Sequence, residues 1–275
     1  MSADPQTSRP DRLPWTARAA TYLYPALVAL VLVAVWEAVT RAGLVSPLIL
    51  PSLSSILQTA VAKFPLLMQM STITASEFVL GFALSVAVGL PLGAMIVYSR
   101  PLETAFYPIL VAFQIVPKAA VAPIFIVWLG TGLSSKVLIA FAIAFFPVVI
   151  DTVVGLRSAQ PETIQLLRSM GGSPFQVFWY VRFPNALPAI FGGLKVASTL
   201  AVVGAIVGEF VSAEKGLGYL VLVANGELDT RLVFACVLTL TLLGIIFYFI
   251  IEIIEKVVVH WHVSARQVET LGGGS

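Results

Sequence analysis

Residues 157–188 read RSAQPETIQLLRSMGGSPFQVFWYVRFPNALP and form a polar stretch between two long apolar runs. Pro161 stands where a helix can begin, because the first turn uses no backbone N–H at that position. Gly171 and Gly172 follow and predict the end of that helix. With about ten residues it is about 15 Å long, too short to cross a bilayer, so we expect it to lie along the membrane surface.

A second short helix is predicted directly after these glycines. Ser173 and Pro174 have the order of an N-cap and a first-turn residue. The helix then covers Phe175–Phe183, and Pro184 ends it. Several of its side chains are aromatic, of the kind that sit at headgroup level. The stretch therefore predicts a two-helix element at the surface of a membrane protein.

The composition of the whole chain agrees with this interpretation. Of its 275 residues 59% are hydrophobic and 11% are charged, and the mean hydropathy is +0.97, which excludes a soluble globular domain of this length. The net charge of +2 gives no reason to expect nucleic acid as a partner. The single cysteine, Cys236, lies in an apolar run, so no disulfide framework is expected.

We predict an all-α, polytopic membrane protein with about six transmembrane helices, in contact with membrane lipid. The surface element lies between the fourth and the fifth helix. Between the first and the second, a short amphipathic helix is expected to start at a serine cap after Pro51. The predicted spans are Tyr22–Thr40, Thr72–Tyr98, Ala105–Leu129, Lys136–Leu156, Ala186–Gly208 and Leu232–Glu255.

Basic residues are more frequent on one side of these spans than on the other. Because positively charged loops tend to stay in the cytoplasm, the richer side is predicted to be cytoplasmic, together with both termini and the surface element. The richer side holds Arg9, Arg12, Arg18, Arg100, Arg157, Arg168, Arg182, Lys256 and Arg266, and the other holds Arg41, Lys63, Lys136, Lys215 and Arg231.

The surface element also carries a spaced motif. From Gln165 the residues run Gln-Leu-Leu, three residues, Gly171, nine residues, Val181, one residue, Phe183 and Pro184. This spacing resembles the cytoplasmic signature of bacterial ABC importer permeases, which is Glu-Ala-Ala, three residues, Gly, nine residues, Ile, one residue, Leu-Pro. The glycine and the proline match, whereas Gln-Leu-Leu replaces Glu-Ala-Ala.

The resemblance implies that the element forms coupling helices, which sit in a groove of an ATP-hydrolysing subunit. Gly171 would carry a left-handed turn, and Pro184 would restart a membrane helix. The residues expected to couple to the ATPase are Gln165, Leu166, Leu167, Met170, Gly171, Phe175, Val181 and Pro184.

Five further stretches extend the resemblance over most of the chain. They are similar to the permease branch that imports nitrate, taurine, alkanesulfonates and bicarbonate, and that also contains importers of pyrimidine precursors of thiamine, riboflavin and aromatic carboxylates. The stretches are LPSLSSIL from Leu50, GFALSVAVGLPLG from Gly81, IVPKAAVAPIFIVWLGTG from Ile115, FFPVVIDTVVGL from Phe145 and GEFVSAEKGLGYLV from Gly208.

Permeases of this kind work as homodimers with two ATP-binding cassette subunits and a periplasmic solute-binding protein, in the bacterial inner membrane. The resemblance divides the chain into a cytoplasmic tail (1–20), a transmembrane permease domain (21–260) with the coupling segment (157–184), and a second cytoplasmic tail (261–275). The chain lacks a G-x-x-x-x-G-K-[ST] loop, so ATP and Mg are expected in the partner ATPase. We therefore expect a non-catalytic subunit that binds no cofactor of its own.

Charged side chains inside the spans are candidates for the substrate pathway, because each is expensive in hydrocarbon unless it is paired or faces a cavity. Lys118 lies among prolines in the third span, where Gln114, one turn earlier, would share its face. It could attract an anionic solute, or pair with Asp151 or Glu77. Asp151 is in turn interpreted as the neutralising partner of Lys118, or as a contact for a solute with a donor or a cation.

Other candidates lie near the outer ends of the spans. Glu77 is expected to face polar headgroups, with an altered gate contact as the alternative. The aromatic residues Phe113, Phe125 and Trp128 would suit a ring-shaped solute. Glu209 is expected at an outer gate beside the dimer axis, with the dimer seam or gate formed by the glycines Gly204, Gly208, Gly216 and Gly218. A solvated loop with a turn at Gly216 is the alternative.

Together these features predict the permease subunit of an ATP-driven importer, most plausibly for a small anion such as a sulfonate, taurine, nitrate or a carboxylate. The first alternative is the same machinery carrying an aromatic or pyrimidine-type compound. The second is an ion-coupled secondary transporter, which would use the intramembrane charges as ion sites. No catalytic constellation is found, and His260 and His262 alone do not predict a metal site.

Overall fold

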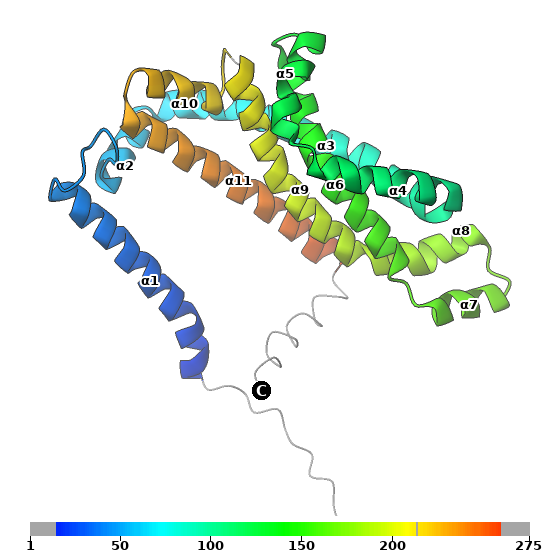
Figure 1. The fold of residues 1–275 in the computed structure, drawn as a ribbon. Helices are drawn as coiled ribbons and strands as arrows, with labels where there is room; N and C mark the ends of the chain where they lie inside the picture. Colours follow the sequence, from blue (N-terminus) through cyan, green and yellow to red (C-terminus); the bar gives the residue numbers. More distant parts are fainter. Residues whose placement is uncertain (1–14, 213, 260–275) are drawn as a thin grey trace, which may run out of the picture.

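The computed structural model describes residues 15–212 and 214–259, and all of their side chains except those of residues 15–22, 100 and 114. Every regular element in this part of the chain is helical (Figure 1). The helices are α1 (Trp15–Arg41), α2 (Leu53–Ala62), α3 (Phe64–Tyr98), α4 (Arg100–Ile115), α5 (Lys118–Leu129), α6 (Leu133–Arg157), α7 (Pro161–Ser169), α8 (Pro174–Val177), the π-helical turn η1 (Phe178–Arg182), α9 (Phe183–Ser212), α10 (Leu217–Gly226) and α11 (Thr230–Val258).

The predicted all-α membrane fold is confirmed. Five helical stretches in the described chain are long and apolar enough to cross a bilayer; they are Leu23–Arg41, Phe64–Tyr98, Leu133–Arg157, Pro174–Ser212 and Thr230–Val258. The predicted third span is not one straight helix. It consists of α4 and α5, which meet at a bend of 100°. The bend follows from Pro117, which lacks the N–H that a continuous helix would need there.

The predicted outer helix is also present. Ser52 caps α2, because its side chain accepts a hydrogen bond from the Ser55 backbone N–H. Only Lys63 separates α2 from α3, so α3 begins at Phe64, well before the predicted start at Thr72. At the N-terminus, α1 begins at Trp15, inside the predicted tail, while residues 1–14 and the predicted tail 261–275 lie outside the described residues.

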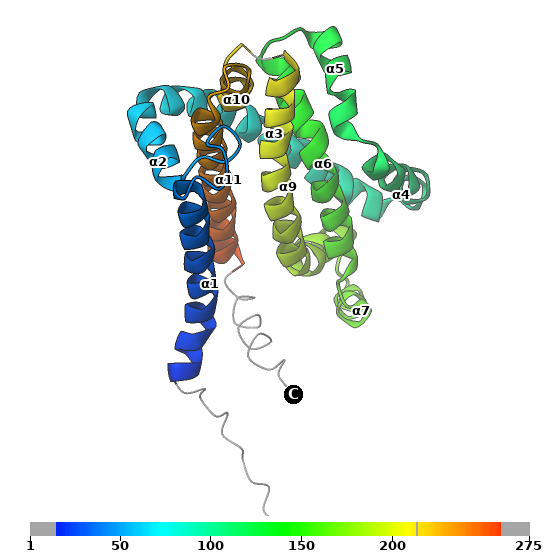
Figure 2. The ribbon, with the colours of Figure 1, turned by 60° about the vertical axis from the view of Figure 1, so that its left-hand side comes forward.

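Helix α6 is the centre of the bundle, packed between α3 and α9 (Figure 2). On α3 the buried positions 77, 81, 85, 89 and 93 follow each other at four-residue spacing, and three of them are glycines. A side chain on Gly89 would lie 2.8 Å from Val148 of α6, and one on Gly93 would lie 2.8 Å from Thr152. Small residues therefore let the backbones of α3 and α6 approach closely.

Helix α9 packs on a neighbouring face of α6, also through small residues, and Ala140 of α6 lies at both contacts. Gly193, Ala197, Ala201 and Ala205 repeat every four residues and are buried. A side chain on Gly204 would meet the Ala140 backbone of α6 at 2.6 Å, and one on Gly208 would meet Lys136 at 3.3 Å. The prediction that Gly204 and Gly208 form the seam between two copies is therefore wrong, because these glycines serve the α6–α9 contact within one chain.

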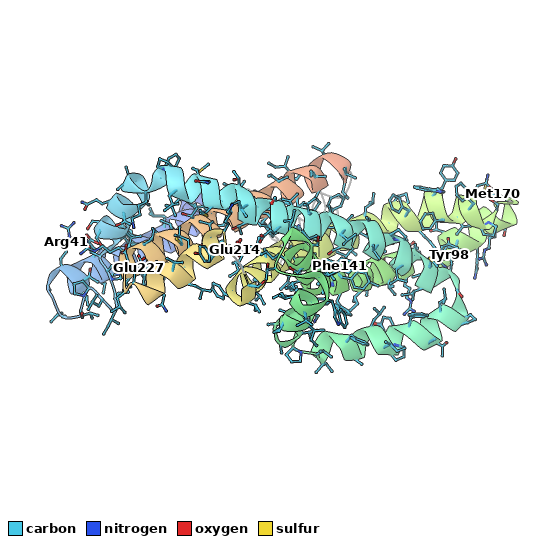
Figure 3. All side chains as sticks on the ribbon, turned by 90° about the horizontal axis from the view of Figure 1, so that it is seen from above. Arg41, Tyr98, Phe141, Met170, Glu214 and Glu227 are labelled. Carbon is cyan, nitrogen blue, oxygen red and sulfur yellow. The ribbon has the colours of Figure 1, made fainter. Side chains whose placement is uncertain are left out.

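The two ends of the bundle carry different elements. Helices α2 and α10 lie at one end, and the α7–α8 turn lies at the other, on the side where α1 begins and α11 ends (Figures 1 and 2). Viewed from above, Met170 and Tyr98 lie at one edge of the molecule and Arg41 and Glu227 at the opposite edge (Figure 3). We call these the α7 end and the α10 end. One apolar core joins α3, α9 and α11, and a second lies under α10 and α2.

Candidate functional site

The surface element at the α7 end has the predicted local structure in its first half. Pro161 opens α7 at the first helical position, and Gly171 follows the helix with φ +82°, the left-handed conformation that favours glycine. Ser173 then forms a capping box with Gln176: the Ser173 Oγ accepts from the Gln176 N–H at 3.3 Å, and Gln176 Oε1 accepts from the Ser173 N–H at 2.7 Å. The turn between α7 and α8 is thus held by its own backbone and caps.

The second half differs from the prediction. The helix that starts at Pro174 does not stop at Pro184 but continues through η1 into α9. A π-helical turn makes this possible: the Phe183 N–H donates to the Phe178 carbonyl, five residues earlier, immediately before the proline. Pro184 then sits in the first turn of α9, where a missing N–H costs little. The coupling segment is therefore rigidly continuous with a membrane-crossing helix.

The predicted coupling residues fall into two groups. Leu166, Met170 and Phe175 are 63%, 76% and 71% exposed and form an apolar tip. Gln165 is also exposed. Leu167 is half-buried instead, because its carbonyl accepts from the Gly172 N–H at 2.9 Å and its side chain packs under that glycine.

Val181 and Pro184 are half-buried and lie behind this tip. They line a groove of about 390 Å³ between α7 and the start of α9, together with Ala159, Gln160, Thr163, Tyr180 and Asn185. The groove has both polar and apolar lining groups, and it separates the exposed tip from the membrane-crossing helices.

Two arginines tie the coupling segment to the corner between α3 and α4. At the start of the segment, Arg157 forms an ion pair with Glu103 of α4, and its guanidinium lies 5.4 Å from the Tyr107 ring centroid. At its end, the Arg182 guanidinium lies 5.6 Å from the Tyr98 ring centroid of α3. A displacement of α7 and α8 would therefore pull on the same corner from both sides. We call these contacts the arginine clamp; its acidic and aromatic partners could not be predicted from the sequence.

At the α10 end, a set of polar residues is buried where three membrane-crossing helices meet. Glu209 of α9 is 0% exposed, and its Oε1 accepts a hydrogen bond from Thr74 Oγ1 of α3 at 2.6 Å. Its Oε2 accepts from the backbone N–H of Gly218, and the Leu217 N–H donates to Thr74 Oγ1 at 2.9 Å. Because these N–H groups belong to the first turn of α10, the carboxylate also meets the positive end of that helix.

The same buried set contains an ion pair. Lys136 Nζ of α6 lies 3.3 Å from Glu77 Oε1 of α3, with 8% and 1% of the two side chains exposed. Glu77 therefore does not face headgroups, and it pairs with Lys136 and not with Lys118. A charge at this depth needs such a partner, and periodicity alone could not reveal a partner on another helix.

Glycine is required where α10 begins. Gly216 has φ +114°, and a side chain there would lie 2.1 Å from Glu209 Oε1; one on Gly218 would lie 2.7 Å from Glu209 Oε2. Both glycines are buried, so the alternative of a solvated loop at Gly216 does not hold. We call Thr74, Glu77, Lys136, Glu209 and residues 216–218 the outer cluster. Within one chain Glu209 is enclosed by this cluster and opens into no channel.

The bent α4–α5 pair holds the other predicted pathway residues. Lys118 starts α5, and its Nζ lies 4.8 Å from the Phe146 ring centroid of α6. Among the ion pairs of the described residues, none joins Lys118 to Asp151, so the predicted pairing is not found. Trp128 is 71% exposed on α5. The side chain of Gln114 lies outside the described residues, and the bend places Gln114 and Lys118 on different helices.

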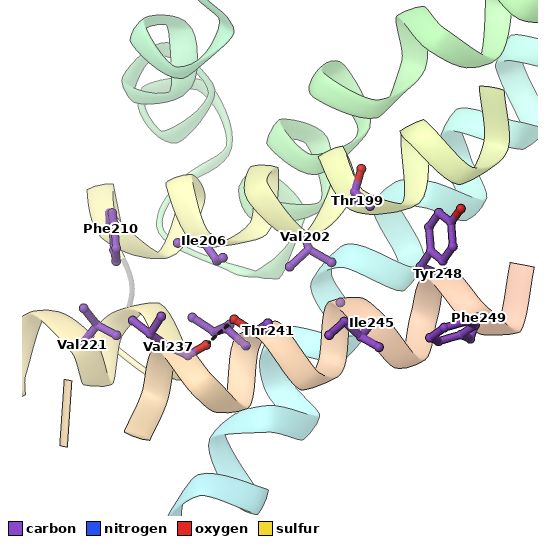
Figure 4. Close-up of a pocket in the computed structure, with 12 residues that line it drawn as sticks. Thr199, Val202, Ile206, Phe210, Val221, Val237, Thr241, Ile245, Tyr248 and Phe249 are labelled. Atoms are coloured by element: carbon purple, nitrogen blue, oxygen red, sulfur yellow. Dashed lines mark hydrogen bonds between the residues drawn. The ribbon is translucent and has the colours of Figure 1, made fainter. Parts of the chain in front are cut away.

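A cleft of about 730 Å³ lies between α9 and α11 (Figure 4). Its walls are mostly aliphatic, and the Thr241 hydroxyl in it donates to the Val237 carbonyl at 2.8 Å. No cluster of three metal-ligating side chains occurs in residues 15–212 and 214–259, and the two histidines of the chain lie outside this part.

Comparison with known proteins gives a consistent result. The family described as binding-protein-dependent transport system inner membrane component matches residues 85–260. A riboflavin transport system permease of Chloroflexus aurantiacus is 44% identical over 165 residues, which cover 60% of this chain and 62% of that protein, so less than two thirds of its length is matched. A formylaminopyrimidine transport permease of Halalkalibacterium halodurans is 35% identical, over 87% of this chain and 96% of that protein.

More distant similarities follow. A taurine transport system permease of Escherichia coli is 28% identical, over 84% of this chain and 87% of that protein. An inward-facing structure of the MetNI methionine ABC transporter superposes with a TM-score of 0.63 at 21% identity, covering 72% of this chain and 98% of that chain. At this identity the structural match speaks for the fold alone.

Proposed function

Because this chain belongs to the family of binding-protein-dependent transport system inner membrane components, we propose that two copies of it form the translocation pathway of an ATP-driven importer. The chain itself is the membrane-crossing permease subunit. The matched residues 85–260 include α7, α8 and the outer cluster apart from Thr74 and Glu77. The predicted family is thereby confirmed.

The coupling segment is the observation that carries the proposal. Its tip exposes Leu166, Met170 and Phe175 on a capped turn, although burial of such side chains is worth about 1.5–3 kcal/mol each. A large apolar tip on a rigid support is suited to a partner with a matching groove. We assign that groove to an ATPase subunit, which holds ATP and Mg, on the cytoplasmic side of the inner membrane. The periplasmic binding protein then docks at the α10 end.

An apolar stripe on α9 supports the second copy. Val196, Val203 and Phe210 recur every seven residues and are 50%, 48% and 45% exposed, on a side of α9 that α6 does not cover. The cleft beside α11 continues this open side. We place the contact with the second copy, and the pathway along it, on this face in place of the Gly204 and Gly208 seam.

We favour a ring compound over a small anion as the cargo. The expectation of an anion rested on Lys118, whose ammonium group lies over an aromatic ring. The two permeases for ring compounds, riboflavin and formylaminopyrimidine, share 44% and 35% of matched residues with this chain, against 28% for the taurine permease. The higher identity over the matched residues therefore supports a heteroaromatic solute.

Uptake into proteoliposomes tests the proposal. The permease is reconstituted with the ATPase and the binding protein encoded beside it, and uptake of the solute retained by that binding protein is measured. We expect uptake only when ATP is present on the side of the vesicle membrane that carries the ATPase subunits. A proton or sodium gradient alone should drive no uptake. Uptake driven by an ion gradient without nucleotide would support the secondary transporter instead.

A further inference from the structure

Asp151 is a carboxylate deep in a membrane-crossing helix. It lies six residues before Arg157, the last residue of α6, which places it about 9 Å from the helix end at 1.5 Å per residue. An ionisable group at this depth is costly unless something compensates it. Lys136 and Lys195, the lysines within α6 and α9, pair with Glu77 and Glu255 respectively.

No hydrogen bond or ion pair to Asp151 occurs among the described residues. The structure instead leaves space beside its carboxylate. Gly193 of α9 faces it, and a side chain at that position would lie 2.6 Å from the Asp151 Cβ and 2.7 Å from its Oδ2. A glycine on the neighbouring helix therefore makes room for the carboxylate without bonding to it.

The free side of this space lies toward the open face of α9. Val154, one turn after Asp151, is 49% exposed, and Val196, one turn after Gly193, is 50% exposed. At Gly192 an added side chain would meet nothing within 4 Å. Asp151 is itself partly exposed. The carboxylate thus borders the face along which the proposed pathway runs.

We propose that Asp151 is a specificity-determining residue that accepts hydrogen bonds from the N–H or O–H groups of a neutral or cationic ring compound in the pathway. An ionised carboxylate only accepts, so it suits adjacent donors on a heterocycle and repels sulfonates and carboxylates. This inference rests on the proposed function, because it needs the α9 face to line the pathway.

Equilibrium binding to the permease–ATPase complex in nanodiscs tests it, with riboflavin as a fluorescent ring probe and radiolabelled taurine as the anion. We expect wild type to bind riboflavin more tightly than taurine. Asp151→Asn, which keeps the shape, should weaken riboflavin binding about tenfold, the effect of losing a hydrogen bond to a charged group. Gly193→Ala should weaken it too, since its methyl group displaces the carboxylate. The controls Glu252→Gln and Gly226→Ala, the second at the end of α10 and away from the α9 face, should leave it unchanged.

Unaltered riboflavin binding by Asp151→Asn overturns the inference, as does tighter binding of taurine, or binding of neither probe, by wild type. The thermal midpoint of each variant is measured in parallel, and a variant that loses riboflavin affinity only together with its fold counts against a role in selectivity. ATP-driven uptake of the binding protein's own solute separates the two proposals. If that uptake is present while Asp151→Asn changes nothing, only this inference fails.

Discussion

The hydroxyl group of Thr74 donates a hydrogen bond of 2.6 Å to the carboxylate of Glu209, across 135 positions of the sequence. It joins α3 to α9 and, through the Leu217 N–H, to the start of α10. The outer cluster therefore fixes the short α10 helix to two membrane-crossing helices. A helix of ten residues would be marginal without such contacts.

Removing either member of this pair should loosen α10. We expect Thr74→Val and Glu209→Ala each to lower the free energy of unfolding by about 1–3 kcal/mol, because a buried group loses its partner. The double variant should cost less than the sum, since both changes break the same bond. Thermal unfolding in detergent measures all three. Thr72→Val on the exposed face of α3 is the control, and strictly additive effects would contradict a direct bond.

The glycine before α10 should tolerate no side chain. Gly216→Ala would place a methyl group 2.1 Å from Glu209 Oε1 on a backbone with φ +114°. We expect a loss of about 1–3 kcal/mol in the free energy of unfolding. At Gly226, the last residue of α10, the same change meets nothing within 4 Å and should cost under about 1 kcal/mol. Equal unfolding midpoints for the two variants would show that the turn is not enclosed by Glu209.

Gly204 and Gly192 lie on different faces of α9. Gly204 packs against α6 within the chain, whereas Gly192 lies on the open face. Gly204→Ala would push a methyl group to 2.6 Å from the Ala140 backbone, whereas Gly192→Ala meets nothing within 4 Å. We expect Gly204→Ala to lower the detergent-resistant folded fraction, with a cost of about 1–3 kcal/mol, and Gly192→Ala to resemble wild type. If Gly204→Ala instead kept the fold and lost only the dimer in a cross-linking assay, this result would support a contact between two copies at Gly204.

The arginine clamp should matter for coupling more than for stability. Glu103 and Arg157 are both 39% exposed, so Glu103→Gln should change the free energy of unfolding by less than about 1 kcal/mol. We expect it to lower the amount of solute imported per ATP hydrolysed. The charge swap Glu103→Arg with Arg157→Glu should recover part of that ratio, and Glu252→Gln serves as the control. A swap that recovers nothing would contradict transmission through this pair.

Local chemistry made much of the coupling segment predictable. Pro161, Gly171 and Ser173 fix the backbone through their own geometry, so the helix start, the left-handed turn and the cap all lie where the sequence placed them. The continuation past Pro184 was missed because the π-helical turn that absorbs the proline depends on packing of the following helix. Local rules predict the conformation of a residue's own turn. They do not predict how contacts with the rest of the fold change that conformation.

Long-range partners were the other gap. The four-residue spacing of Gly204 and Gly208 indicated a close helix contact, but not which helix makes it. Glu77 was expected at the headgroups because the sequence does not show its partner. That partner, Lys136, lies on another helix. A single sequence shows which side chains need compensation in a membrane, whereas only the fold shows what provides it.

The tip of the coupling segment is proposed to link ATP hydrolysis to transport. Met170 is 76% exposed there, so Met170→Asp should leave the fold and the proposed dimer intact. The direct measurement is the ratio of solute imported to ATP hydrolysed by the reconstituted complex, with Glu252→Gln on α11, outside the coupling segment, as control. We expect Met170→Asp to lower this ratio severalfold while ATP hydrolysis continues. A ratio equal to that of wild type would show that the tip does not link hydrolysis to transport.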